Sequence, residues 1–133
     1  MVSTKLKKIN TSQYRAIVDS IDRDSVFVAE IDGKSIQSLS EYLEAVWQVF
    51  RFPNTGYVNY YAYLDWIRDL DWLNSEKYVF IVHNSADLLR ETLRDRQIVM
   101  DSLEEEVIPW WEGEVEQYSV AGKAKPFHVY LVD

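Results

Sequence analysis

The sequence contains no cysteine, so disulfides and thiolate chemistry are excluded. It also has no apolar run near the roughly 20 residues that a helix needs to cross a bilayer. The N-terminal stretch MVSTKLKKINTSQYR is basic but lacks the apolar segment of a secretory signal peptide. These absences predict a protein without membrane contact that is made and kept in the cytoplasm.

Glycine and histidine are scarce as well. None of the four glycines belongs to a phosphate-binding loop or to a Gly-x-Ser-x-Gly nucleophile motif. His83 and His128, the two histidines, lie at or inside predicted strands without ligand spacing, so we expect structural roles for them. Asp65 and Asp69 lie one turn apart on a predicted helix, but a glycosidase needs carboxylates on two sides of its substrate. The sequence therefore predicts no enzyme activity, no metal and no cofactor.

The sequence has fewer basic residues than acidic ones. Fourteen Lys and Arg stand against 22 Asp and Glu, for a formal net charge of −8. Residues 1–8 hold three lysines and no acid, so the rest of the chain carries −11. Such a body repels nucleic acids and anionic lipid and attracts basic proteins. The charge indicates a basic partner, although solubility alone also explains it.

What is present is a regular alternation of strands and helices. Apolar runs predict strands at 25–31, 77–83 and 127–132. Between the first two, a capping box at Ser38–Glu41 begins a helix that ends before Phe52-Pro53, and a loop over 53–58 leads to a second helix. This order predicts one α/β domain with a small three-stranded parallel sheet covered by helices.

Two further segments are predicted less completely. After the second strand, Asn84 or Ser85 is expected to cap a helical region that Pro109 interrupts. Residues 1–24 are polar and lack strong apolar periodicity, apart from a short helix near 13–20. We therefore expect an N-terminal extension over 1–24, a domain over 25–133, and little loss of stability when residues 1–20 are removed.

The stretch NYYAYLDWIRDLDW at 59–72 combines aromatic and acidic residues on one predicted helix. Helical spacing puts Tyr60, Tyr63, Ile67 and Leu70 toward the core. The opposite face then carries Tyr61, Asp65, Arg68, Asp69 and Trp72. A solvated face is one interpretation. Exposed aromatics beside acids also indicate a protein-binding face, because tyrosine and tryptophan are enriched at interaction hot spots.

The order of elements from the strand VFVAEIDG through PNTGYVNYYAYLDWIRDL resembles the barstar family of barnase-type ribonuclease inhibitors. The resemblance covers 25–83 and 126–133. It implies that the helix after Asn59 and the loop before it, with Tyr57, enter the basic cleft of a nuclease. By position, Asp65 matches the central inhibitory aspartate of the family.

The chain also departs from the family pattern. Tyr61 stands where the namesake has another acid, Asp69 is an additional acid, and Gly56 is displaced by one residue. Residues 84–125 do not follow the namesake. They include the segment 101–116, with seven acids and no Lys or Arg, which either extends the acidic binding surface or forms a solvated helix and loop.

The resemblance implies a monomeric, non-catalytic inhibitor of a secreted or toxin ribonuclease, with partner contacts at Tyr57, Tyr61, Asp65, Arg68, Asp69 and Trp72. Two alternatives stay open. The same fold can bind a non-nuclease protein, or the aromatic and acidic residues can bind a carbohydrate or another small ligand.

Overall fold

The computed structural model describes residues 5–53 and 56–133. Its centre is a parallel sheet in the order β1-β4-β3-β2. The strands are β1 (Leu6–Ile9), β2 (Val26–Asp32), β3 (Lys77–His83) and β4 (Phe127–Val132). The α/β class and the three predicted strands are confirmed, but the predicted number of strands is wrong, because β1 adds a fourth.

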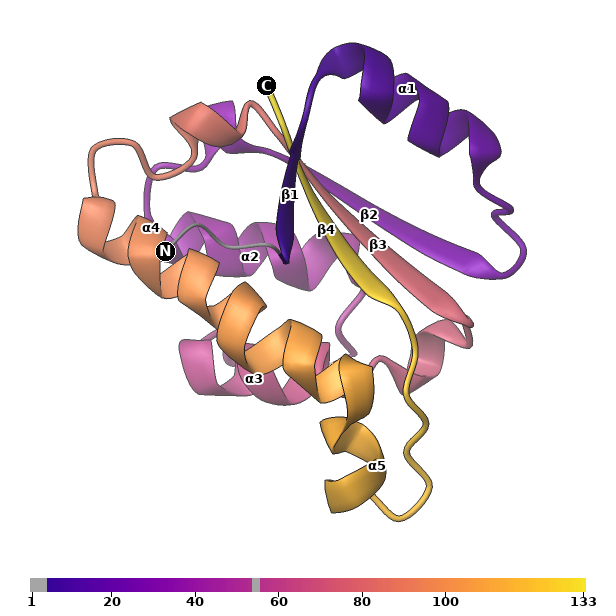
Figure 1. Ribbon diagram of the computed structural model, residues 1–133. Coiled ribbons are helices and arrows are strands. Elements are labelled where there is room, and N and C mark those ends of the chain that lie inside the picture. The colour runs from indigo at the N-terminus through magenta and orange to yellow at the C-terminus, as the bar shows by residue number, and fades with distance from the viewer. Residues whose placement is uncertain (1–4, 54–55) are drawn as a thin grey trace.

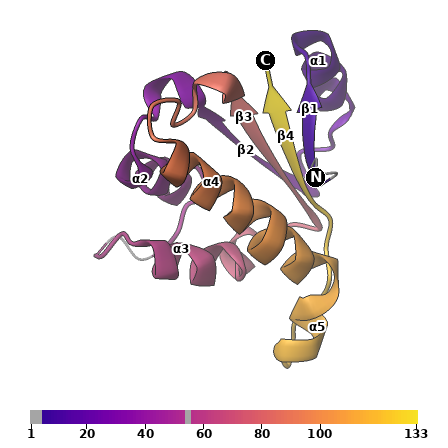
Figure 2. The same ribbon diagram turned by 60° about the vertical axis from the view of Figure 1, so that its left-hand side comes forward.

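Helices cover both faces of the sheet (Figures 1 and 2). On one face lie α2 (Leu39–Val49), α3 (Tyr60–Ile67) and α4 (Leu93–Asp101), and on the other lies α1 (Thr11–Ser20). The steps from β2 to β3 and from β3 to β4 cross the sheet in one direction, whereas the step from β1 to β2 runs the opposite way. Right-handed crossovers therefore place α1 on the face opposite the other helices.

The main core lies between the sheet and α2, α3 and α4. Phe50, at the end of α2, contacts the rings of Phe80 and Phe127 at centroid distances of 5.2 Å and 6.1 Å. All five central residues of β3, Tyr78–Val82, are buried. A strand buried on both faces reads as a continuous apolar run, which is why β3 was predicted at its observed bounds.

The segment after β3 differs from its prediction. A 3₁₀ turn spans Ser85–Asp87, and α4 begins only at Leu93. Pro109 does not interrupt the helical region. A π-helical segment, Ser102–Val107, precedes it and another, Trp110–Glu114, follows it before α5 (Val115–Tyr118). Proline removes one backbone donor, and the wider π-helical bonding lets the helix continue past that gap. We call residues 102–118 the helical arm.

The N-terminal segment is part of the sheet and of its cover. β1 pairs in parallel with β4, with Leu6 opposite Val129 and Ile9 opposite Val132. From α1, Tyr14 and Val18 pack on the second face of the sheet. The short sequence LKKI gives little strand signal on its own. Lysines are, however, typical of an edge strand because they discourage pairing with another chain.

Because β1 and α1 pack on the sheet, we now expect deletion of the N-terminal segment to lower the stability of the fold. Removal of residues 1–21 exposes the apolar face around Val79 and Ile81 and leaves the edge of β4 unpaired. We expect the free energy of unfolding to fall by about 2 kcal/mol or more, the scale of uncovering one large side chain or two. Urea unfolding measures it. Arg15→Ala, at an exposed position of α1, should change it by less than about 0.5 kcal/mol. An unchanged midpoint for the deletion would restore the interpretation of 1–24 as an appendage.

The Glu30 carboxylate links α1 to the sheet through hydrogen bonds. The Tyr14 hydroxyl donates to Oε1 of Glu30 at 2.7 Å, and Nε2 of His83 lies 2.8 Å from the same oxygen. The rings of Tyr14 and His83 meet edge to face at 4.7 Å. Burial opposes ionisation of Glu30, but the hydrogen bonds from His83 and Tyr14 outweigh it and hold the pKa of this carboxyl below its ordinary value of 4.5.

A carboxyl whose pKa is lowered by folding stabilises the fold above its unfolded pKa, and this contribution is lost as the pH falls through the folded value. We therefore expect Glu30→Gln to lower the free energy of unfolding at pH 7, and the deficit relative to wild type to shrink as the pH drops below 4.5. Urea titrations from pH 7 to pH 3 measure it. A deficit that stays constant with pH would contradict the role assigned to the ionised carboxyl.

Candidate protein-binding site

The helix α3 is shorter than predicted. Asn59 caps it as expected, with its side-chain oxygen accepting from the Ala62 amide at 3.0 Å. The helix ends at Ile67, whereas the sequence predicted helix through residue 72. Leu70 is fully buried with a left-handed φ of 54°, a conformation that L-residues seldom adopt and no helix can continue. The chain turns there so that Leu70 enters the core.

The exposed face of α3 carries Tyr61 and Asp65, and the partly exposed Arg68 caps the end of the helix on the same side. Their spacing of four and three residues puts them on one side of the helix. The side chain of Asp65 is 80% exposed, and Tyr61 is 78% exposed. Tyr57, in the loop before α3, is equally open. Of the predicted core positions, Tyr63, Ile67 and Leu70 are fully buried, and Tyr60 is partly buried against the core. The core side of the predicted division is therefore confirmed.

Trp72 lies elsewhere, which corrects the prediction that it shares a helix face with Asp65. It belongs to a 3₁₀ turn, Asp71–Leu73, beyond the reversal at Leu70. Its indole nitrogen donates to the carbonyl of Phe50 at 3.0 Å, and its ring meets Trp66 edge to face. The side chain is thus held partly buried against the core.

Arg68 connects α3 to the helical arm. One terminal nitrogen lies 3.7 Å from a carboxylate oxygen of Asp65, and the other lies 3.7 Å from one of Glu106. Its guanidinium also stacks over the Trp110 ring at 5.5 Å. Glu106 and Trp110 were not singled out from the sequence. The acidic segment 101–116 was one candidate for an extension of this surface, but a contact across 38 residues leaves no local pattern.

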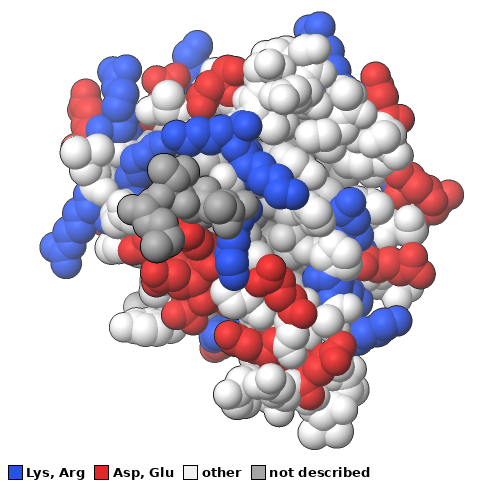
Figure 3. All heavy atoms as spheres, viewed as in Figure 1, with Lys and Arg blue, Asp and Glu red and all other residues white. Residues whose placement is uncertain are grey.

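Acidic side chains gather along the arm. Figure 3 shows them over the lower part of this view, along the segment that runs from α4 to α5. The negative charge of these side chains also affects α3. Burial raises the pKa of Tyr60, and the carboxylates of Glu106 and Asp101 raise it further. The docking surface, as we use the term, consists of Tyr57, Tyr61, Asp65, Arg68 and Glu106. It is acidic and aromatic, and it draws on two helices.

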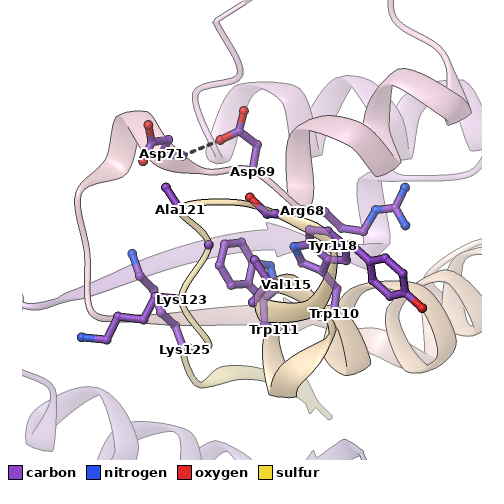
Figure 4. A pocket seen from close by; sticks show the side chains of 12 residues that line it. Arg68, Asp69, Asp71, Trp110, Trp111, Val115, Tyr118, Ala121, Lys123 and Lys125 are labelled. Atoms are coloured by element: carbon purple, nitrogen blue, oxygen red, sulfur yellow. Dashed lines mark hydrogen bonds between the residues drawn. The ribbon is translucent and has the colours of Figure 1, made fainter.

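A pocket of about 480 Å³ lies between the end of α3 and the arm. Figure 4 shows Asp69 and Asp71 on one side of it and Trp110, Trp111 and Tyr118 on another. Asp69 lies beyond the end of α3 and lines this pocket, and its carboxylate accepts from the Asp71 amide at 3.2 Å. Burial and these two carboxylates raise the pKa of Tyr78 to about 12.

The remaining functional expectations concern metals and membranes. No group of three or more His, Asp or Glu within residues 5–53 and 56–133 could hold a metal ion. His83 contacts Glu30 at the end of β3, and burial, with nearby Lys77 and Lys7, lowers the pKa of His128 in β4. Within the same described ranges, no helix has the length and apolar character that a bilayer crossing requires.

A buried chain of hydroxyls sets the position of α3. The hydroxyl of Tyr63 lies 2.9 Å from that of Tyr42 in α2 and 2.9 Å from that of Ser102 in the arm. The Ser102 hydroxyl donates in turn to the Val99 carbonyl at 2.7 Å. Burial raises the pKa of Tyr63 to about 12. These contacts join the three elements beneath the docking surface.

The fold and this surface define a small α/β domain with an exposed helix face that carries acidic and aromatic side chains. A family model described as Barstar (barnase inhibitor) matches residues 26–132. The chain belongs to that family, as its sequence resemblance indicated. No curated protein and no solved structure gave a match. Both β1 and α1 lie outside the matched residues.

Tyr63→Phe removes the central hydroxyl of the buried chain and leaves the Tyr42 hydroxyl without this partner. We expect a loss of about 1–3 kcal/mol in the free energy of unfolding, the cost of an unsatisfied buried polar group. Chemical denaturation measures it. Tyr61→Phe is the matched control, because its exposed hydroxyl should contribute less than about 0.5 kcal/mol. Equal stabilities of the two variants would show that the buried hydroxyl contacts do not hold the helices together.

Proposed function

We propose that this protein inhibits a secreted or toxin ribonuclease by inserting the acidic face of α3 into its basic active-site cleft. One observation carries the proposal: Asp65 projects from α3 with its side chain 80% exposed, between Tyr61 and Arg68. The sequence resemblance assigns to it the place of the family's inhibitory aspartate. A carboxylate so placed is free to take the position of a substrate phosphate. The protein itself would have no catalytic activity.

The proposed mechanism begins with long-range attraction. The net charge of −8 and the acids along the arm draw a basic partner toward the docking surface and raise its association rate. Once docked, Asp65 accepts charge-assisted hydrogen bonds from the cations of the cleft. Tyr57 and Tyr61 exclude water around that contact, as the rim of a hot spot does. Asp69 and Trp72, which lie beyond the end of α3, are further predicted contacts.

The cellular setting belongs to the same proposal. An inhibitor of this kind protects the cell that makes the nuclease, so we propose that the protein acts in the cytoplasm and is a monomer until it meets its target. Nucleic acid and membrane are not among the proposed partners, because the acidic surface repels both.

Asp65→Ala is expected to cost about 2–5 kcal/mol of binding free energy with a purified barnase-type ribonuclease, a range to which the family's namesake complex itself contributes. The loss arises because the partner's cations stay desolvated and unpaired. Inhibition of RNA cleavage and surface plasmon resonance measure it, and the association rate of wild type should fall steeply with added salt.

Asp19→Ala on α1 is the matched control, because it removes the same charge from an exposed position on the opposite face of the sheet. It should bind like wild type. If Asp65→Ala inhibits as well as Asp19→Ala, the inhibitory surface lies elsewhere, and the acidic segment 101–116 is the next region to test.

Two alternative functions are distinguished by wild type alone. A non-nuclease partner on the same fold predicts no inhibition of barnase-type ribonucleases, together with capture of a different basic protein. A carbohydrate or small-ligand function predicts saturable binding in a glycan or metabolite screen, with perturbation of the tryptophans around the pocket in Figure 4.

A further inference from the structure

A cation stands in the middle of the acidic docking surface. Arg68 caps the C-terminal end of α3, three residues after Asp65, and its side chain is 28% exposed. It reaches toward Asp65 and Glu106 on either side. A surface that binds a wholly basic cleft gains nothing from a guanidinium at this position, because like charges repel. Its presence therefore calls for a partner feature beyond positive charge.

Two contacts within the protein fix the position of the Arg68 guanidinium. Its Nε donates to the Leu64 carbonyl at 3.1 Å, and its Cζ lies over the Trp110 ring, 5.5 Å from the ring centroid. These contacts oppose a swing of the side chain away from the surface during docking. Arg68 will therefore remain at the interface when a partner covers α3.

The two terminal nitrogens of Arg68 are incompletely satisfied. Their distances of 3.7 Å to Asp65 and Glu106 exceed hydrogen-bonding length, and within the described residues they make no hydrogen bond. In solution, water supplies the missing acceptors. When a partner excludes that water and its cations attract Asp65, the terminal nitrogens need a new acceptor, because an unpaired charge in an interface is costly.

We propose that Arg68 is a specificity-determining residue that binds a carboxylate of the partner, one that lies within an otherwise basic cleft. A guanidinium offers two parallel N–H donors to a carboxylate, so this pairing has a defined geometry. The inference rests on the proposed inhibitor function and refines it. The partner must present cations to Asp65 and, within the span of one helical turn, an acid to Arg68. Basic proteins without that acid are rejected.

The direction in which removal of Arg68 changes the affinity for the partner distinguishes two roles for this residue. If Arg68 only offsets the charge of Asp65 and Glu106, its removal makes the surface more acidic and strengthens binding of a basic partner. If it binds a partner carboxylate, its removal weakens binding despite the more favourable net charge. The proposal therefore predicts an effect opposite to that of simple electrostatics.

The test uses the full chain and a purified barnase-type ribonuclease. Arg68→Gln should raise the dissociation constant about 10- to 100-fold, the equivalent of a hydrogen bond to a charged group. Arg68→Lys, which keeps the charge but not the planar fork, should bind less tightly than wild type. Arg15→Gln on α1 is the matched control for net charge and should bind like wild type. Thermal unfolding and a two-dimensional amide spectrum establish that each variant is folded.

A double-mutant cycle identifies the carboxylate. Each acid of the ribonuclease cleft is changed to its amide in turn, and one of these changes should lose its effect in the Arg68→Gln background. Unchanged or tighter binding by a folded Arg68→Gln overturns the inference while leaving the proposed function intact, provided that Asp65→Ala still weakens inhibition. Failure of wild type itself to bind overturns the proposed function and this inference together.

Discussion

The docking surface depends on the buried hydroxyl contacts of Tyr63. α3 has only eight residues, too few to be stable alone in water, so its position is imposed by what lies beneath it. Tyr63 supplies a fully buried ring against the core and a hydroxyl that meets Tyr42 on one side and Ser102 on the other. Hydrogen bonds are directional, whereas apolar packing tolerates sliding and rotation. The chain of hydroxyls therefore orients α3 and, with it, the side on which Asp65 projects.

The same contacts place the helical arm beside α3. Ser102 lies at the start of the arm, and further along it the Trp111 indole donates to the Ile67 carbonyl at 3.0 Å, at the last residue of α3. The arm is thus bound to both the middle and the end of the helix. With this alignment Glu106 comes within reach of Arg68. An acidic segment that follows β3 by some twenty residues thereby becomes part of the surface around Asp65.

The opposite face of the sheet is completed by residues outside the family match. In a sheet of residues 26–132 alone, the apolar side chains of Val79 and Ile81 would lack α1 as a cover, and β4 would be an edge strand. Here β1 and α1 supply both. The contact of Tyr14 and His83 with Glu30 then fixes α1 by a hydrogen-bonded ionised group instead of by apolar packing alone. This cover lies away from α3, so it supports the sheet without occupying the docking surface (Figure 2).

The sequence by itself determined the elements whose signals are local. Continuous apolar runs located β3 and β4 at their observed bounds, capping residues located the starts of α2 and α3, and helical spacing separated Tyr63 and Ile67 from Asp65. Only the tertiary structure decided the rest. β1 gains its partner from the far end of the chain, and the burial of Leu70 ends α3 and carries Trp72 away from Asp65. Arg68 likewise meets Glu106 only because two helices are held together. Each of these outcomes depends on free energy shared between distant segments, and such coupling has no periodicity that a single stretch of sequence can display.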